Sequence, residues 1–232
     1  MSKVEPKAIK VYKPEIMNCP KCNTKLVFAY TASNKVIQFS SGKIIKIKNM
    51  AYRCPNCNDG NIYSSLTAHK MSLKGYTYST KVICTIEYYK SMHKSREEIC
   101  DMLASKDIEI SDRNVDIIYK KIKSIMELDS DKLVKESYER QMKEFNEIRI
   151  AVDHITINPY HYVVFYDYFN GEILGLWKCE GTDDPKLHEH LKKYLNNPNI
   201  KYIVTVRPQS KVYGILKSYA PNSSKFLSFA KF

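Results

Sequence analysis

The sequence has 232 residues, of which 44% are hydrophobic and 27% are charged. This length and apolar content suffice for more than one folded unit, but no run of about 18 apolar residues occurs, so we predict no membrane-spanning helix. The N-terminal residues lack the apolar stretch of a secretory signal, which predicts a cytoplasmic, nucleoid-associated protein.

The formal net charge of +12 is unevenly distributed. Residues 1–94 contain 16 Lys and Arg against 4 Asp and Glu, whereas residues 95–232 contain 21 of each kind. Because a localised basic segment attracts polyanions, we expect double-stranded DNA as the partner of the N-terminal part. The alternative is a lysine-rich surface that is merely well solvated.

Four of the seven cysteines form two pairs, Cys19-Pro-Lys-Cys22 and Cys54-Pro-Asn-Cys57. Two intervening residues allow both thiolates of a pair to bind one ion, and two pairs complete a tetrahedron. Residues 23–53 contain three segments rich in β-branched and aromatic residues, which predict short strands. We therefore predict a zinc ribbon over residues 1–66 with a structural Zn²⁺. Iron, as in rubredoxin-like sites, is the rival metal.

The remaining cysteines, Cys84, Cys100 and Cys179, lie in apolar stretches. We interpret them as small core residues and not as ligands or nucleophiles.

Residues 67–128 have the pattern of a helix-turn-helix segment. A helix is expected over residues 80–93, and Ser95 with Glu98 forms a capping box that begins the next helix. After the interruption at residues 105–110, Ser111 caps a further helix with an apolar face at 115, 118, 122 and 125. Two capped helices around a short turn fit a helix-turn-helix, although a helical bundle used for packing or dimerisation is the alternative.

The last of these helices would read DNA in the major groove from its N-terminal end. Arg113 and Asn114 suit guanine and adenine edges, and Lys120, Lys121 and Lys123 suit phosphates. Residues 129–147 predict a charged helix without Pro or Gly, which we interpret as a stiff connector able to pair with another copy in a homodimer.

Residues 148–232 predict strands at 148–157, 160–169 and 172–180, with Asn170-Gly171 as a two-residue hairpin turn. A helix, a strand at 200–206, a second helix and a final strand follow. This is the element order of a ribonuclease-H-like fold, so the whole chain is expected to be α+β. Asp153 lies in the middle of the first strand, where a carboxylate must be hydrogen-bonded, paired or bound to a cation. A hairpin could bring His154 and His161 near each other, but we favour the interpretation that they are ordinary sheet residues.

The layout resembles the aspartate-aspartate-glutamate transposases of insertion sequences, which have a zinc ribbon, a helix-turn-helix and a ribonuclease-H-like core. Three segments carry the resemblance besides the cysteines: "IAVDHITI", "YFNGEILG" and "PNSSKFLSFAKF". The resemblance implies that Asp153 stands at the first catalytic aspartate. It also implies terminal repeats of an element as the DNA target.

The sequence departs from this family at the other acidic positions. Val206 stands where the second aspartate is expected, and no candidate for the third acid precedes Phe232. Two Mg²⁺ ions cannot be held by Asp153 alone, so Mg²⁺ is expected only if the site is completed elsewhere.

These observations predict a transposase-like DNA-binding protein that is catalytically incomplete, with a partial core over residues 148–232. One alternative is an active or split transposase that carries out metal-dependent strand transfer. Another is a transcription regulator built from a zinc ribbon and a helix-turn-helix.

Overall fold

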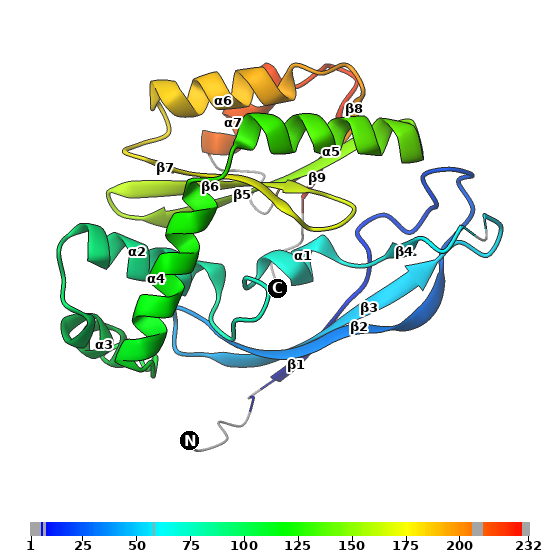
Figure 1. The fold of residues 1–232 in the computed structure, drawn as a ribbon. Helices are drawn as coiled ribbons and strands as arrows, with labels where there is room; N and C mark the ends of the chain where they lie inside the picture. The colour runs from blue at the N-terminus through cyan, green and yellow to red at the C-terminus, as the bar shows by residue number, and fades with distance from the viewer. Residues whose placement is uncertain (1–5, 7, 58, 206–210, 229–232) are drawn as a thin grey trace. The chain divides into compact units, whose positions relative to one another are not determined.

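The computed structural model describes residues 6, 8–57, 59–205 and 211–228. The chain divides between Ser124 and Ile125 into two compact units, each with its own β-sheet. The fold is mixed α/β, with two sheets and seven helices in the described residues (Figure 1). The four-segment division predicted from the sequence stays a prediction.

The first unit begins with a four-stranded ribbon. The strands have the order β1-β3-β2, and the short β4 also pairs with β3. β1 is parallel to β3, whereas β2 and β4 are antiparallel to it. The strands are β1 (Ala8–Tyr12), β2 (Val27–Gln38), β3 (Ile44–Arg53) and β4 (Ile62–Tyr63).

Two details of this ribbon differ from the sequence prediction. The first two predicted strands of the cysteine insert are one strand, β2, because two bulges let the chain continue past the irregular stretch. β1 was not predicted, because its partner β3 lies more than 30 residues away and local pattern does not show such a pairing.

The helices of the first unit follow the predicted order. Ser95 accepts from the backbone N–H of Glu98, and the Glu98 carboxylate accepts from the backbone N–H of Ser95, so the predicted capping box is confirmed. The helices are α1 (Leu66–Lys70), α2 (Thr80–Ser91), α3 (Arg96–Ala104) and α4 (Asp112–Met126), with the unit boundary inside the last turns of α4.

The end of β2 holds the ribbon to the helical part of the first unit. The backbone of Gln38 pairs with the segment that precedes α2, and its side-chain amide donates to the carbonyl of Asp107 at 2.8 Å. Gly42 (φ +73°) lies so close that a Cβ there would be 2.7 Å from the Cβ of Asp107. Glycine is therefore required where the ribbon turn meets the turn between α3 and α4.

The second unit contains a five-stranded sheet of order β7-β6-β5-β8-β9. The first three strands along the chain form an antiparallel meander, and β8 and β9 run parallel to the central β5. The strands are β5 (Ile148–Ile157), β6 (Tyr160–Asp167), β7 (Ile173–Cys179), β8 (Ile200–Thr205) and β9 (Lys225–Ser228).

Three helices lie on one face of this sheet and close the core of the second unit: α5 (Ser130–Phe145), α6 (Pro185–Leu195) and α7 (Lys211–Tyr219). Ile150 and Val152 point from β5 into this core, which also contains Val134 of α5 and Leu191 of α6. The helix that we expected to be a connector is thus packed on the second sheet.

The predicted two-residue turn at Asn170-Gly171 is wrong, because the loop is longer. The N–H of Asp167 donates to the carbonyl of Glu172 at 2.9 Å, so four residues, 168–171, form the loop. The carboxylate of Asp167 accepts from the backbone N–H groups of Phe169 and Asn170, which fixes this wider turn.

Within the described part of the chain, no helix is both long and apolar enough to cross a membrane.

Candidate functional site

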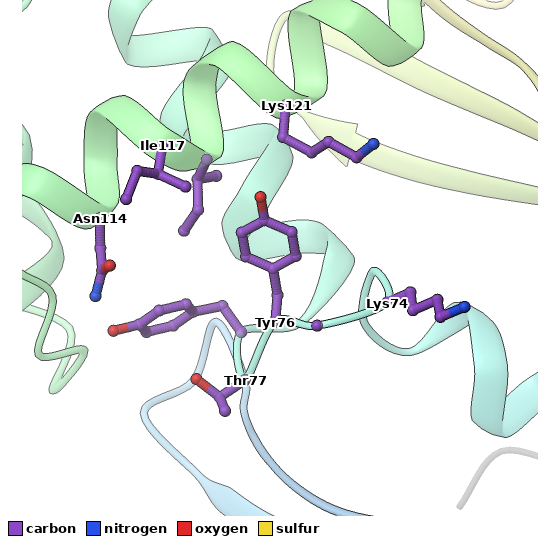
Figure 2. Close-up of a pocket in the computed structure, with 9 residues that line it drawn as sticks. Lys74, Tyr76, Thr77, Asn114, Ile117 and Lys121 are labelled. Carbon is purple, nitrogen blue, oxygen red and sulfur yellow. The ribbon is translucent and has the colours of Figure 1, made fainter.

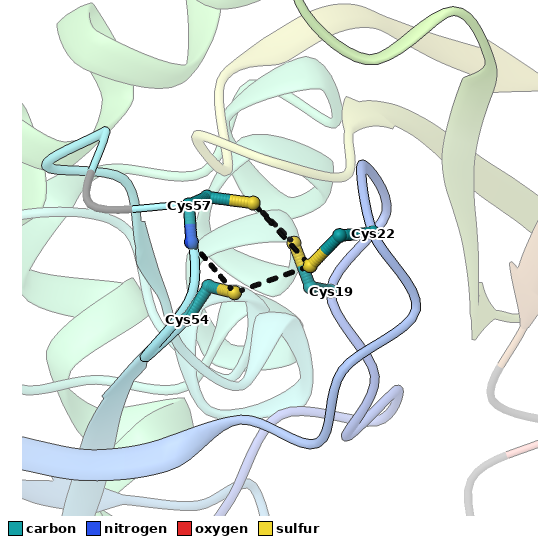
Figure 3. Close-up of side chains that lie close together, drawn as sticks. All are labelled: Cys19, Cys22, Cys54 and Cys57. Atoms are coloured by element: carbon teal, nitrogen blue, oxygen red, sulfur yellow. Dashed lines mark hydrogen bonds between the residues drawn. The ribbon is translucent and has the colours of Figure 1, made fainter.

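The four paired cysteines converge at one end of the ribbon (Figure 3). Their sulfur atoms all lie within 4.8 Å of one another, and the Cys22–Cys54 and Cys22–Cys57 separations are both 3.4 Å. A tetrahedral ion with metal–sulfur bonds of about 2.3 Å needs sulfur–sulfur distances of about 3.8 Å. The quartet is therefore nearly preformed and can hold a metal ion such as zinc.

Backbone geometry positions the first cysteine pair. The N–H of Cys19 donates to the carbonyl of Thr24 at 2.8 Å, and the N–H of Asn23 donates back to the carbonyl of Cys19 at 2.9 Å. Asn23 has a positive φ of 59°, which tightens the turn after Cys22. These bonds aim both sulfurs of the pair to the same side of the hairpin.

Polar contacts hold the two cysteine pairs together. The side-chain amide of Asn56 donates to the hydroxyl of Thr24 at 2.9 Å, and Lys21 forms an ion pair of 2.8 Å with Asp59. Sequence reasoning missed these four residues, because nothing but proximity to the cysteines distinguishes them in the sequence. These polar contacts reduce the free-energy cost of bringing the four thiols together before an ion binds.

The thiols differ in acidity. Hydrogen bonds with Thr24 lower the pKa of the exposed Cys22 thiol to about 6, whereas the hydrogen bond with Cys22 raises the pKa of Cys57. One thiolate is therefore available near neutral pH, and binding of a divalent ion would displace the protons that the other thiols share.

The other cysteines lie apart from this site. Cys84 and Cys179 are buried, and burial raises the pKa of Cys179 to about 12. Cys100 is partly buried, and its thiol donates to the carboxylate of Asp112 at 3.2 Å. Burial raises the pKa of Cys100 to about 11, so it is a weak nucleophile at neutral pH.

α4 has one buried face and one outward face. Val115, Ile118 and Ile122 are buried, whereas Arg113, Ile117 and three lysines are exposed: Lys120, Lys121 and Lys123. Arg113, Ile117 and Lys120 are spaced by four and three residues, so they form one row along the helix. We call the exposed residues 113, 117, 120, 121 and 123 the outward face of α4.

The acidic residues of α4 are engaged with neighbouring helices. Asp116 forms ion pairs with Lys90 at 3.4 Å and with Arg96 at 3.6 Å, and Asp112 accepts from Cys100. The negative charges of this helix are therefore partly neutralised from the side of α2 and α3. Its outward face presents basic and apolar groups.

A groove of about 560 Å³ lies between α4 and the loop of residues 74–78 (Figure 2). Asn114, Ile117 and Lys121 line it from the helix, and Lys74 and Tyr76 line it from the loop. The loop residues were not predicted as part of a site, because the stretch has no periodic pattern.

Asn114 faces this groove and is half-buried, unlike the exposed Arg113. Its side chain is a hydrogen-bond partner of Tyr78, whose hydroxyl also donates to the carbonyl of Glu109 at 2.8 Å. Burial nonetheless raises the pKa of Tyr78. Asn114 must exchange its contact with Tyr78 if it is to contact a ligand.

Asp153 is half-buried on the central strand β5, opposite Val164 of β6. One carboxylate oxygen accepts from the backbone N–H of His154 at 2.9 Å. In the described residues, the cysteine quartet is the only set of three or more metal-ligating side chains close enough to share an ion. Val206, at the position of the expected second aspartate, lies outside the described residues, although Val152 pairs with Thr205 beside it.

His154 and His161 do come together. Nε2 of His154 lies 2.7 Å from Nδ1 of His161, and the two rings stack with centroids 4.9 Å apart. The hydroxyl of Thr156 lies 3.5 Å from the same nitrogen of His161. This is a hydrogen-bonded pair, and the described residues add no third metal-ligating side chain to it.

Asp167, the other carboxylate of this sheet, has a structural role. It is fully buried and accepts from Ser137, Arg140 and Gln141 of α5. These contacts tie α5 to the hairpin between β6 and β7. They leave little capacity for a cation.

The sequence was also compared with known proteins. It matches no known protein family, and a search of curated proteins found no match.

Proposed function

We propose that this chain is a transposase-like DNA-binding protein that contacts duplex DNA through the outward face of α4. The observation that carries the proposal is the separation of charge on this helix. Its aspartates are held by Lys90, Arg96 and Cys100, whereas Arg113 and the three lysines are exposed. In the described part of the first unit, none of these four side chains takes part in an ion pair.

The local architecture supports a helix-turn-helix. α3 and α4 are two capped helices separated by residues 105–111, and a third helix, α2, contacts α3. In such a motif the N-terminal residues of the second helix face base edges. Arg113 is placed for a guanine edge, Ile117 for a thymine methyl group, and the lysines for phosphates.

The element order of the second unit supports a ribonuclease-H-like core, since a three-stranded meander is followed by helix, strand, helix and strand. Asp153 lies on its central strand, where the resemblance puts the first catalytic aspartate. In the described residues, it belongs to no group of three or more metal-ligating side chains close enough to share an ion. The proposed protein therefore binds DNA, including element terminal repeats, without holding two Mg²⁺ ions itself.

The test is a selection of bound sequences from a random pool of duplex DNA with the zinc-loaded chain. The wild-type protein is expected to enrich a defined sequence. The double variant Arg113→Ala/Ile117→Ala is expected to lose that enrichment, because each base contact contributes about 1–3 kcal/mol of discrimination.

The matched control is Lys132→Ala/Lys135→Ala, which changes two exposed residues of α5. It should enrich the same sequence as wild type. Unchanged enrichment by the α4 variant, or no enrichment by the wild type, contradicts the proposal. Enrichment of host promoters without element ends would favour a transcription regulator.

A split transposase is the second candidate, and the central position of Asp153 favours it. In that case the chain alone is inactive in an Mg²⁺-dependent strand-transfer assay, and a polypeptide that supplies carboxylates restores activity. Asp153→Asn abolishes the restored activity. If it does not, Asp153 is not a metal ligand and this candidate fails.

A further inference from the structure

The sheet of the first unit has an open face that the proposed function does not use. Strand register places five side chains on it: Ile9 and Val11 of β1, Lys46 and Lys48 of β3, and Phe28 of β2. Ile9 pairs with Lys46 and Val11 with Lys48, and partners in register point to the same side of a sheet. We call these five residues the ribbon face.

The opposite face of the same strands is different. Ile37 and Ile47 are buried there with Tyr12 and Ala68 in a small core. In β3, the buried Ile47 lies between Lys46 and Lys48, which are half-buried on the ribbon face. Core packing explains the buried set but leaves the ribbon face unexplained.

The ribbon face is basic and has no acidic residue to balance it. From Ile16 to Arg53 the sequence contains seven Lys and Arg and no Asp or Glu. The nearby Glu15 is engaged at the start of α1, where it accepts from Ser65 and from the backbone N–H of Thr67. One of the seven, Lys21, is paired with Asp59, and the charge of the ribbon face is complementary to an anionic partner.

The same face exposes large apolar side chains. Ile9 is 58% exposed, Val11 57% and Phe28 53%, and the Phe28 ring meets Tyr52 edge-on with centroids 6.0 Å apart. The phosphate wall of a duplex offers such groups no partner, because paired bases are stacked inside it. Unpaired bases expose π-faces that stack on aromatic side chains.

The width of the sheet fits one strand of nucleic acid. β1, β3 and β2 are neighbours, so the face spans two inter-strand spacings, or about 10 Å. Lys46 lies between Ile9 of β1 and Val36 of β2, and Lys48 lies between Val11 of β1 and Asn34 of β2. Phe28 lies further along the same face, opposite Tyr52, which is about 13 Å along β3 from Lys48. The phosphate-binding lysines and the base-stacking ring therefore follow one another along one track.

We propose that the ribbon face binds single-stranded DNA, with Phe28 stacking on an unpaired base and with Lys46 and Lys48 contacting phosphates. This inference deepens the proposed function. It rests on that function only for the choice of nucleic acid as the ligand. It assigns the unpaired strand to the ribbon and the duplex to α4.

The test measures binding of a fluorescein-labelled 20-nucleotide oligo-dT by the full zinc-loaded chain, beside a 20-base-pair duplex. Phe28→Ala is expected to weaken oligo-dT binding about tenfold, because base stacking is lost. Phe28→Leu keeps an apolar side chain and should weaken it similarly, whereas Phe28→Trp should retain it.

The lysines are tested by the salt dependence of the same binding. Lys46→Gln/Lys48→Gln is expected to reduce the slope of log K against log salt by about 1.4, which corresponds to two phosphate contacts on a single strand. Lys43→Gln/Lys81→Gln removes two exposed lysines outside the ribbon face as the matched control. It should change the slope much less.

The outcomes separate this inference from the proposed function. Arg113→Ala/Ile117→Ala should lose duplex sequence enrichment while binding oligo-dT normally. The inference is overturned if Phe28→Ala and Lys46→Gln/Lys48→Gln bind oligo-dT as tightly as the control Lys43→Gln/Lys81→Gln does. This holds whatever the result with duplex DNA. A second outcome also overturns it: the wild type does not bind oligo-dT, and Phe28→Ala abolishes self-association of the chain. The ribbon face would then be an interface between two copies of the chain.

Discussion

At the scale of single residues, the two carboxylates of the second sheet have contrasting environments. Asp153 is half-buried, and its carboxylate accepts from the N–H of the next residue. Asp167 is fully buried and accepts from three side chains of α5 and two backbone N–H groups. The carboxylate of Asp167 therefore ties α5 to the hairpin between β6 and β7, whereas the described contacts of Asp153 are local to its own strand.

Asp167→Ala should strongly destabilise the second unit. It leaves Gln141 and Ser137 buried without this acceptor, and loss of one partner from a buried charged network costs about 3–5 kcal/mol. Asp167→Asn should cost less, because its carbonyl oxygen can still accept from the loop N–H groups. Urea unfolding measures both, with the exposed Asp183→Asn as control. Equal stability of Asp167→Ala and the control would show that the network is unimportant.

His190 offers an optical test, because it stacks on Trp177, the only tryptophan of the chain, at 4.8 Å between ring centroids. Burial lowers the pKa of His190, which outweighs the opposite effect of Glu189 and Asp131. Trp177 fluorescence should therefore titrate with a midpoint below the usual histidine value of about 6.5. His190→Gln should abolish this titration.

The sign of the linked stability effect follows from the same shift. A depressed pKa in the folded state means that the unfolded chain binds the proton more readily. The contribution to the free energy of unfolding is thus complete above about pH 6.5 and declines as the pH falls towards the folded pKa. A fluorescence midpoint above 6.5 would contradict the assigned environment.

At the scale of elements, local signals predicted well where the cause is local. The Ser95–Glu98 capping box lies within four residues, and the strand expected at 148–157 has the bounds of β5. The cysteine spacing located the quartet that can hold a metal ion. The residues 120, 121 and 123 are exposed on α4 because their spacing opposes its apolar face.

Long-range contacts were not predictable in this way. The partners of Asp167 lie 26 to 30 residues earlier in the chain, and its carboxylate turns the expected two-residue hairpin into a four-residue loop. Similarly, Asn114 shares a hydrogen bond with Tyr78, which a local reading of α4 does not show. Such pairings depend on which elements meet in space.

Metal removal tests the ribbon as an element. The chain as purified should carry one metal ion, and Cys22→Ser should lose it, because three sulfurs do not close the coordination sphere. A chelator should lower the thermal midpoint of the first unit, since ion binding contributes to folding. Elemental analysis and a thermal scan measure the two effects, with Cys84→Ser as the control for metal content.

Full metal content in Cys22→Ser, or a thermal midpoint that a chelator leaves unchanged, would contradict a structural metal site. Elemental analysis also decides between zinc and iron.

At the scale of the whole molecule, the chain combines a basic N-terminal part with a neutral C-terminal part. Residues 1–94 contain the whole excess of positive charge, and α4 adds a basic face next to them in sequence. DNA affinity should therefore come from the first unit and should weaken steeply with salt, because lysine–phosphate contacts release counterions.

The most direct test is the slope of log K against log salt for a 20-base-pair duplex. Lys120→Gln/Lys121→Gln/Lys123→Gln is expected to reduce that slope by about 2.7, which corresponds to three phosphate contacts on duplex DNA. Lys132→Gln/Lys135→Gln/Lys143→Gln, at three exposed positions of α5, should leave it close to the wild-type value. Equal slopes for the two triple variants would contradict the assignment of the DNA-binding surface to α4.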